Sequence, residues 1–74
     1  MSTTIEAVVT LPGLQRVRLS RAYSQRDLAK AAAVSPRTII YAEQGYSVSL
    51  RTLRKLAEVL KVDPSELTGQ EPAP

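Results

Sequence analysis

The segment from residue 24 to residue 45, SQRDLAKAAAVSPRTIIYAEQG, constrains the fold more than any other part of this chain. It predicts two short helices joined by a tight turn. Ser24 can accept a hydrogen bond from the amide of Asp27 while Asp27 reaches back to the amide of Ser24. This capping box predicts a first helix of about eight or nine residues.

A second helix is predicted over residues 36–44. Ser35 caps it, and Pro36 occupies its first position, where the missing amide costs nothing. Gly45 ends it, because glycine adopts a positive φ freely. The apolar residues of the two helices fall on inward faces: Leu28, Ala29, Ala32, Ile39 and Ala42. This layout is typical of a helix-turn-helix, whose second helix reads DNA.

Three further helices complete the predicted fold. The first covers residues 14–22 and buries Leu14 and Val17, and Tyr23 after it is expected to be a core aromatic. The next covers residues 50–61 behind a Ser49 cap, with an apolar stripe at helical spacing: Leu50, Leu53, Leu56, Ala57 and Leu60. A capping box at residues 63–66, with a proline at the first helical position, predicts a short last helix that ends near residue 69. The expected fold class is all-α with five helices.

The ends of the chain read differently from its middle. Residues 1–12 are rich in Thr, Ile and Val without a helical period, so they form either a disordered arm or one short strand that could pair with a second copy. Residues 13–69 are the predicted helix-turn-helix domain, and residues 70–74 are a predicted disordered tail.

Charge and composition exclude several function classes. All ten basic residues lie between Arg16 and Lys61 with only three acidic ones, which leaves a charge of +7 in that span and suits a phosphate backbone. Without Cys or His, the chain has no disulfide, thiolate metal site or histidine catalysis, and no cofactor is expected. The carboxylates fall at helix caps, on exposed faces or, for Glu43, in an expected ion pair, with no nucleophile and base arranged together, so an enzyme is not expected. No apolar run reaches the ~20 residues of a membrane span, and a cytoplasmic location is expected.

Many residues between positions 13 and 68 match one family pattern in register: Leu14, Val17, Arg18, Ser24, Gln25, Leu28, Ala29, Val34, Ser35, Thr38, Ile39, Glu43, Gly45, Thr52, Leu53, Lys55, Leu56, Ala57, Leu60 and Val62. With these residues the chain resembles the Xre/Cro family of lambda-repressor-like helix-turn-helix proteins. The resemblance implies the five-helix topology of that family, with helix 36–44 in the major groove of double-stranded DNA.

The resemblance also implies site residues. The base-reading face would comprise Ser35, Pro36, Arg37, Thr38 and Tyr41. The contacts to the DNA backbone would come from Gln25, Arg26, Tyr46, Ser47 and Arg51. Arg18 and Glu43 would form a structural ion pair.

Two of these side chains have alternative roles. Arg37 can hold guanine O6 and N7 in two hydrogen bonds, or it can clamp a phosphate. Tyr41 can lie against a thymine methyl group or place its hydroxyl on a phosphate.

Three positions depart from the family pattern. Ala33 stands where glycine is frequent in the turn, and a positive φ there would cost alanine about 1 kcal/mol. Ile40 occupies a position that is usually polar, and with Tyr41 it forms either a contact for thymine methyl groups or an apolar patch for a protein. The loop after Gly45 is short and lacks the usual proline.

The leading hypothesis is a sequence-specific transcriptional regulator, namely a repressor that binds a palindromic site as a homodimer. Either Leu67 and the last helix or the arm at residues 5–9 would form the dimer surface. The alternative is a protein-interaction module that uses the same fold to bind a toxin or the transcription machinery.

Overall fold

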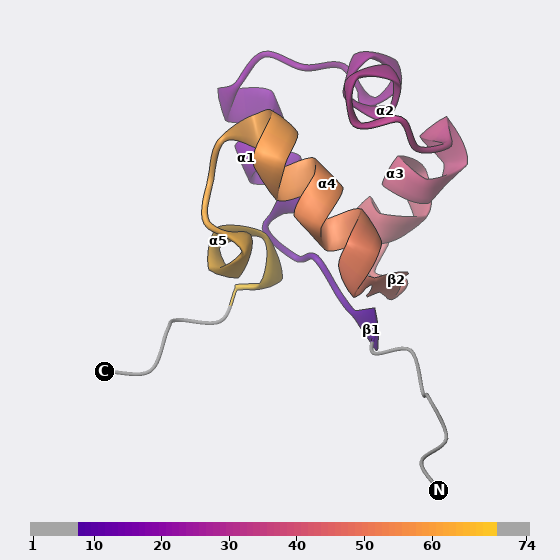
Figure 1. Cartoon of the computed structure of the whole chain (residues 1–74), viewed down its shortest axis with the longest axis vertical. Helices are drawn as coiled ribbons and strands as arrows, with labels where there is room; N and C mark the ends of the chain where they lie inside the picture. The colour runs from indigo at the N-terminus through magenta and orange to yellow at the C-terminus, as the bar shows by residue number, and fades with distance from the viewer. Residues whose placement is uncertain (1–7, 70–74) are drawn as a thin grey trace, which may run out of the picture.

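The computed structural model describes residues 8–69, which form five helices and two short strands. The helices are α1 (Leu14–Ser20), α2 (Gln25–Ala32), α3 (Pro36–Glu43), α4 (Leu50–Leu60) and α5 (Pro64–Thr68), and the strands are β1 (Val8–Val9) and β2 (Val48–Ser49). In Figure 1, α4 crosses the middle of the molecule, where it contacts α2, α5 and both strands. The predicted all-α fold with five helices is confirmed, and the strand pair is an addition to it.

Side-chain caps explain where four of the helices begin. The hydroxyls of the serines that precede α2, α3 and α4 each accept a hydrogen bond from a backbone N–H in the first turn, at 2.9–3.2 Å: Ser24, Ser35 and Ser49. Asp63 accepts from the N–H of Ser65 at 3.0 Å and caps α5. Each bond satisfies an amide that has no partner within its own helix.

Only one of the two predicted capping boxes is reciprocal. At α5, the Asp63 N–H donates to the Glu66 carboxylate at 3.3 Å, as predicted. At α2, the Ser24 hydroxyl accepts from Asp27, but within residues 8–69 no bond returns from the Ser24 N–H to the Asp27 carboxylate. The shorter side chain explains this difference, because aspartate has one methylene less than the glutamate that closes a box.

Three helices end on a residue other than glycine in the left-handed conformation. The φ angles are between 57° and 62° at Ala22, Ala33 and Lys61, which follow α1, α2 and α4. The N–H of the next residue then donates to a carbonyl five residues back at 2.9–3.1 Å, and this next residue packs against the core in each case: Tyr23, Val34 and Val62. Burial of the apolar side chain thus offsets backbone strain of about 1–2 kcal/mol at each helix end. Because of this turn, α1 ends at residue 20 and not at the predicted residue 22.

The core is the one that the apolar periodicity predicts. Eleven predicted side chains are buried: Leu14, Val17, Leu28, Ala29, Ala32, Ile39, Ala42, Leu53, Leu56, Ala57 and Leu60. Leu50 is half-buried, and Tyr23 packs against the cluster as expected. Full burial of each leucine or isoleucine contributes about 1.5–3 kcal/mol, so these side chains hold the helices together.

Leu67 belongs to this core, which corrects its assignment to a dimer surface. Its side chain is completely buried on the inner face of α5, and its carbonyl accepts a hydrogen bond from the Gly13 N–H at 2.9 Å. The chain passes so close at this point that a Cβ on Gly13 would lie 2.2 Å from the Glu66 carbonyl oxygen. Helix α5 is therefore fixed against the start of α1 and does not offer Leu67 to a second copy.

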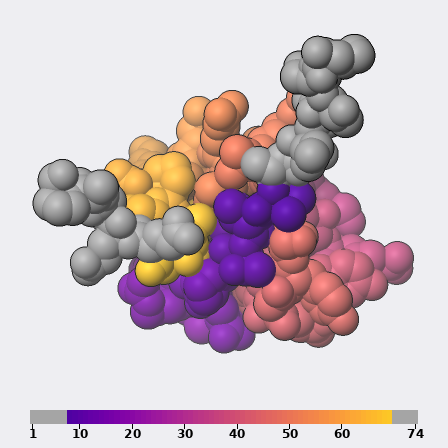
Figure 2. All heavy atoms as spheres, turned by 90° about the horizontal axis from the view of Figure 1, so that it is seen from below, coloured from indigo at the N-terminus to yellow at the C-terminus, as the bar shows by residue number. Residues whose placement is uncertain are grey.

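The strand pair connects the N-terminal segment to the loop after α3. β1 and β2 are antiparallel, with Val8 opposite Ser49 and Val9 opposite Val48, so the strand pairs within its own chain. Figure 2 shows this segment, in indigo, between the yellow C-terminal helix and the salmon segment that contains β2. Buried Leu11 anchors it. The rest of the predicted arm, residues 1–7, and the predicted tail lie outside the described residues.

Ala33→Gly is expected to raise the free energy of unfolding by about 1 kcal/mol, because glycine adopts the positive φ of this turn without strain. Urea denaturation would measure the change. Ala31→Gly is the matched control, since the same substitution at an exposed, regular position of α2 should lower stability by about 0.5–1 kcal/mol. Equal losses in both variants would show that the turn is unstrained.

The cap of α5 makes stability depend on pH. Hydrogen bonds from the backbone N–H and then the side chain of Ser65 lower the pKa of the Asp63 carboxyl below its usual value. Since its pKa is lower in the folded than in the unfolded chain, Asp63 adds stability at neutral pH, and this is lost as the pH falls below about 4. Thermal denaturation between pH 7 and pH 2 should therefore show a smaller loss of stability in Asp63→Asn than in the wild type. Identical pH profiles would contradict this assignment.

Candidate nucleic-acid interface

Helices α2 and α3 form the predicted motif, with the tight turn at residues 33–35 between them. Ile39 and Ala42 bury the inner face of α3, and the Ser35 cap fixes where its first turn begins. The opposite face is left open to solvent. α3 ends at Glu43, with Gln44 as its cap residue, one position before the predicted end.

The predicted base-reading residues gather on this outer face and on the first turn of α3. Ser35, Pro36 and Arg37 are exposed, Thr38 is half-buried and Tyr41 is 47% exposed. Arg37 lies in the first turn, so its guanidinium can extend away from the domain without breaking any contact within it. A side chain placed in this way can reach a base edge or a phosphate.

The predicted backbone contacts surround that face. Arg26 is exposed in the first turn of α2, and Ser47 and Arg51 are exposed beside the N-terminus of α4. Both helix N-termini carry the positive ends of their dipoles, which favour an anion. Tyr46 is also exposed, but its ring packs against Tyr41 with the centroids 5.5 Å apart.

Gln25 makes a contact that sequence reasoning missed. Its side chain is half-buried, and its Nε2 donates to Glu43 Oε1 at 3.0 Å. One N–H of the Gln25 amide is therefore used within the domain, and its second N–H and the backbone N–H groups at the start of α2 remain for a phosphate. The signal was present in the sequence as a polar residue at the first position of one helix and a glutamate at the last position of the next.

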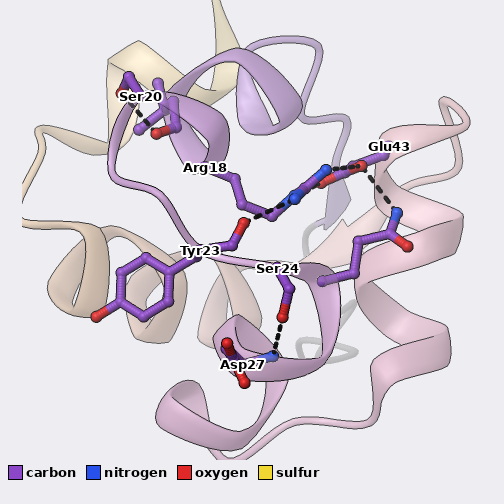
Figure 3. Close-up of polar contacts among 8 residues, drawn as sticks. Arg18, Ser20, Tyr23, Ser24, Asp27 and Glu43 are labelled. Atoms are coloured by element: carbon purple, nitrogen blue, oxygen red, sulfur yellow. Dashed lines mark hydrogen bonds and ion pairs between the residues drawn. The ribbon is translucent and has the colours of Figure 1, made fainter.

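Arg18 and Glu43 form a buried ion pair at the centre of the same network. Their side chains are 8% and 5% exposed, and Arg18 Nη2 donates to Glu43 Oε1 at 3.1 Å while Nε donates to the other oxygen. Arg18 Nη1 also donates to the carbonyl of Tyr23 at 2.8 Å. Figure 3 shows Arg18 reaching from α1 toward Glu43 at the end of α3. With Gln25 included, one carboxylate connects α1, α2 and α3.

Arg21 is a second basic residue with a structural contact. Its Nε donates to the carbonyl of Leu60, the last residue of α4, at 3.0 Å. A cation at this position also complements the negative end of the α4 dipole. Among the basic residues of the middle of the chain, Arg18 and Arg21 thus make contacts within the domain, although Arg21 is exposed, whereas Arg26, Arg37 and Arg51 are exposed and available for a phosphate or a base.

A hollow lies beside α3, between its outer face and the start of α4. Six of its lining residues carry a hydroxyl group: Thr38, Tyr41, Tyr46, Ser47, Ser49 and Thr52. Val48 is its apolar wall. Hydroxyl groups beside a helix N-terminus can donate to the oxygens of a phosphate or accept from a base edge.

Comparison with known proteins agrees with this geometry. The family model HTH_3, described as helix-turn-helix, matches residues 14–67. The chain belongs to this family, the lambda-repressor-like helix-turn-helix proteins. No curated protein sequence matches it. A similar solved structure is the crystal structure of the restriction-modification controller protein C.AhdI from Aeromonas hydrophila, with 32% identity, a TM-score of 0.71 and coverage of 76% of this chain and 86% of that chain.

Membership of the helix-turn-helix family supports DNA binding and transcription regulation as the activity of this chain, and not catalysis. None of the helices within residues 8–69 has the length and apolar character needed to cross a bilayer. The predicted base-reading residues lie at the N-cap, in the first turn and on the outer face of α3. Among the predicted backbone contacts, Gln25 is half-buried and also bonds to Glu43.

Glu43→Gln is expected to lower the free energy of unfolding by about 2–4 kcal/mol, because it leaves the buried Arg18 guanidinium without a negative partner. Urea denaturation would measure this loss. Arg16→Gln is the control for loss of a charge, since Arg16 is an exposed residue of α1, the helix that carries Arg18, and its loss should change stability by less than about 0.5 kcal/mol. A similar, small change in both variants would show that the ion pair does not hold α1 to α3.

Proposed function

We propose that this protein is a sequence-specific transcriptional regulator that binds double-stranded DNA with α3 in the major groove. The observation that carries the proposal is the open outer face of α3, with Arg37 in its first turn, in a chain of the helix-turn-helix family. In proteins of this type the N-terminal residues of the second motif helix face the base edges, and the preceding helix crosses the DNA backbone.

Arg37 is the main base-reading residue of this proposal. A guanidinium can donate two hydrogen bonds to guanine O6 and N7, which is worth about 1–3 kcal/mol of discrimination. Tyr41 lies one turn further along the exposed face and can meet the next base, with a thymine methyl group as the natural partner of its ring. Ser35, Pro36 and Thr38 complete the reading face.

Phosphate contacts on both sides would hold α3 in register. On one side, Arg26 and the free backbone N–H groups of the first turn of α2 face the strand, and on the other side Ser47 and Arg51 do. These contacts supply much of the affinity and make it fall with salt, but they carry no sequence information directly.

We further propose that the regulator acts in the cytoplasm as a symmetric homodimer on a palindromic operator, and that it represses transcription by covering a promoter. Half-sites about 10–10.5 base pairs apart would then match the two copies of α3. The similarity to C.AhdI, a restriction-modification controller protein, supports a role in the control of transcription. Because Leu67 is buried, the dimer surface has to use other residues.

A second function is favoured by one observation. Ile40 and Tyr41 are 37% and 47% exposed on the outer face of α3, and Tyr46 beside them is 63% exposed. Such a patch can bind a protein, for example a toxin or part of the transcription machinery, in place of DNA. The experiment below separates the two functions.

Selection of bound duplexes from a random library at about 0.15 M salt is the direct test, since specific complexes survive there and most non-specific ones weaken. We expect enrichment of a palindrome with half-sites one turn apart. Affinity for this site should fall with salt, with a log–log slope of about −0.9 for each phosphate contacted.

Arg37→Ala should then lose about 1–3 kcal/mol of discrimination at one base pair in each half-site.

Arg51→Ala is the matched control for Arg37→Ala, because it removes an equal charge beside a phosphate and not in the reading turn. It should weaken binding to all sequences about equally and reduce the salt slope by about 1. If the library yields no enriched sequence and the residual binding is insensitive to salt, the protein-binding function replaces the proposed one.

A further inference from the structure

The loop after α3 folds back over the exposed side of the helix. Gly45 has a φ of +102°, and its N–H donates to the carbonyl of Ala42 at 3.2 Å. The N–H of Tyr46 donates to the carbonyl of Tyr41 at 3.0 Å. This is the same helix-ending motif that closes α1, α2 and α4, with glycine in the left-handed position.

The motif at the end of α3 differs from the other three in the direction of its apolar contact. After α1, α2 and α4, the residue that follows the left-handed position packs against the core. After α3 this residue is Tyr46, which stays 63% exposed and packs on Tyr41, a predicted base-reading residue. The two rings are tilted by 58°, an attractive arrangement for an aromatic pair.

Both ends of the short loop are fixed, so Tyr46 is a firm support. Its N-terminal side is held by the hydrogen bond to Tyr41, and two residues further on Val48 is buried and paired with Val9 of β1. The strand pair therefore limits how far the backbone of Tyr46 can move away from α3.

Tyr41 has space to turn if that support is removed. It lies beside the hydroxyl-lined hollow of about 650 Å³, whose other walls include Thr38 and Thr52. Because the ring borders this open space and its ring contact is with Tyr46, loss of that contact would leave the Tyr41 ring free to populate a second rotamer.

We propose that Tyr46 is a positioning residue that holds the Tyr41 ring in its base-reading orientation, and that it thereby determines the base preference at the position read by Tyr41. Tyr46 does this without contacting a base. The proposal rests on the proposed function, because it assigns the specificity of the same DNA-reading face to a residue outside the helix-turn-helix.

The test compares Tyr46→Leu with Tyr46→Phe and Tyr41→Leu in the full chain. Affinities would be measured for the selected site and for each of its single-base variants. Tyr46→Leu and Tyr41→Leu should lose discrimination at the same base pair, by roughly threefold to tenfold. Tyr46→Phe should retain it, because the ring and not the hydroxyl makes the contact. The double variant should lose no more than Tyr41→Leu alone.

A DNA-free measurement separates this proposal from the proposed function. Three-bond couplings of Tyr41 should show a single χ1 rotamer in the wild type and in Tyr46→Phe, and rotamer averaging in Tyr46→Leu. If no DNA sequence is preferred but these couplings change as expected, the proposed function fails, and the specificity role of Tyr46 fails with it. If the wild type prefers a sequence and Tyr46→Leu weakens binding to all variants equally, Tyr46 contacts a phosphate and the proposal is overturned.

Discussion

The carboxylate of Glu43 is the group on which the orientation of α3 depends. It accepts hydrogen bonds from Arg18 of α1 and from Gln25 of α2, and it stands on the last residue of α3. Within residues 8–69 no buried side-chain nitrogen or oxygen lacks a partner, so the burial of this charge is fully compensated. A small α-helical domain has few polar contacts between distant segments. The contacts of Glu43 with Arg18 and Gln25 therefore fix the orientation of α3 relative to α1 and α2.

The helix ends provide the second constraint. Four of the five helices end on a left-handed residue followed by an apolar or aromatic side chain, and three of these side chains enter the core. Strain is accepted at Ala22, Ala33 and Lys61 because each turn returns an apolar group to the interior. After α3, the glycine at position 45 removes the strain and the aromatic side chain stays outside. The same left-handed turn thus adds an apolar side chain to the core after α1, α2 and α4, and places the Tyr46 ring on the surface after α3.

Local signals in the sequence were enough for the helices and most of the core, and insufficient for contacts between distant segments. The caps at Ser35 and Ser49 and the periodic leucines predicted the helices closely, because these signals act within one turn. The burial of Leu67 depends on how α5 packs against Gly13, which no local sequence pattern predicts. A short strand within residues 1–12 was one of the two predicted alternatives, but its partner at residues 48–49 was missed, since a two-residue strand carries too little periodicity to be recognised. The hydrogen bond from Gln25 to Glu43 required knowing where Glu43 lies.

The two ends of α3 are held differently, and this has a consequence for recognition. At its C-terminal end, Glu43 is fixed on the inner side by the ion pair, and Tyr41 meets Tyr46 on the outer side. At its N-terminal end, the Ser35 cap holds the backbone, while the exposed Arg37 side chain is free to move. An arginine has several rotatable bonds and can adapt to a base or a phosphate, whereas a tyrosine has only two and depends on being placed correctly before binding. Of the two proposed base-reading residues, the more rigid Tyr41 therefore lies where a neighbouring ring contacts it, and the more adaptable Arg37 lies where no such contact is needed.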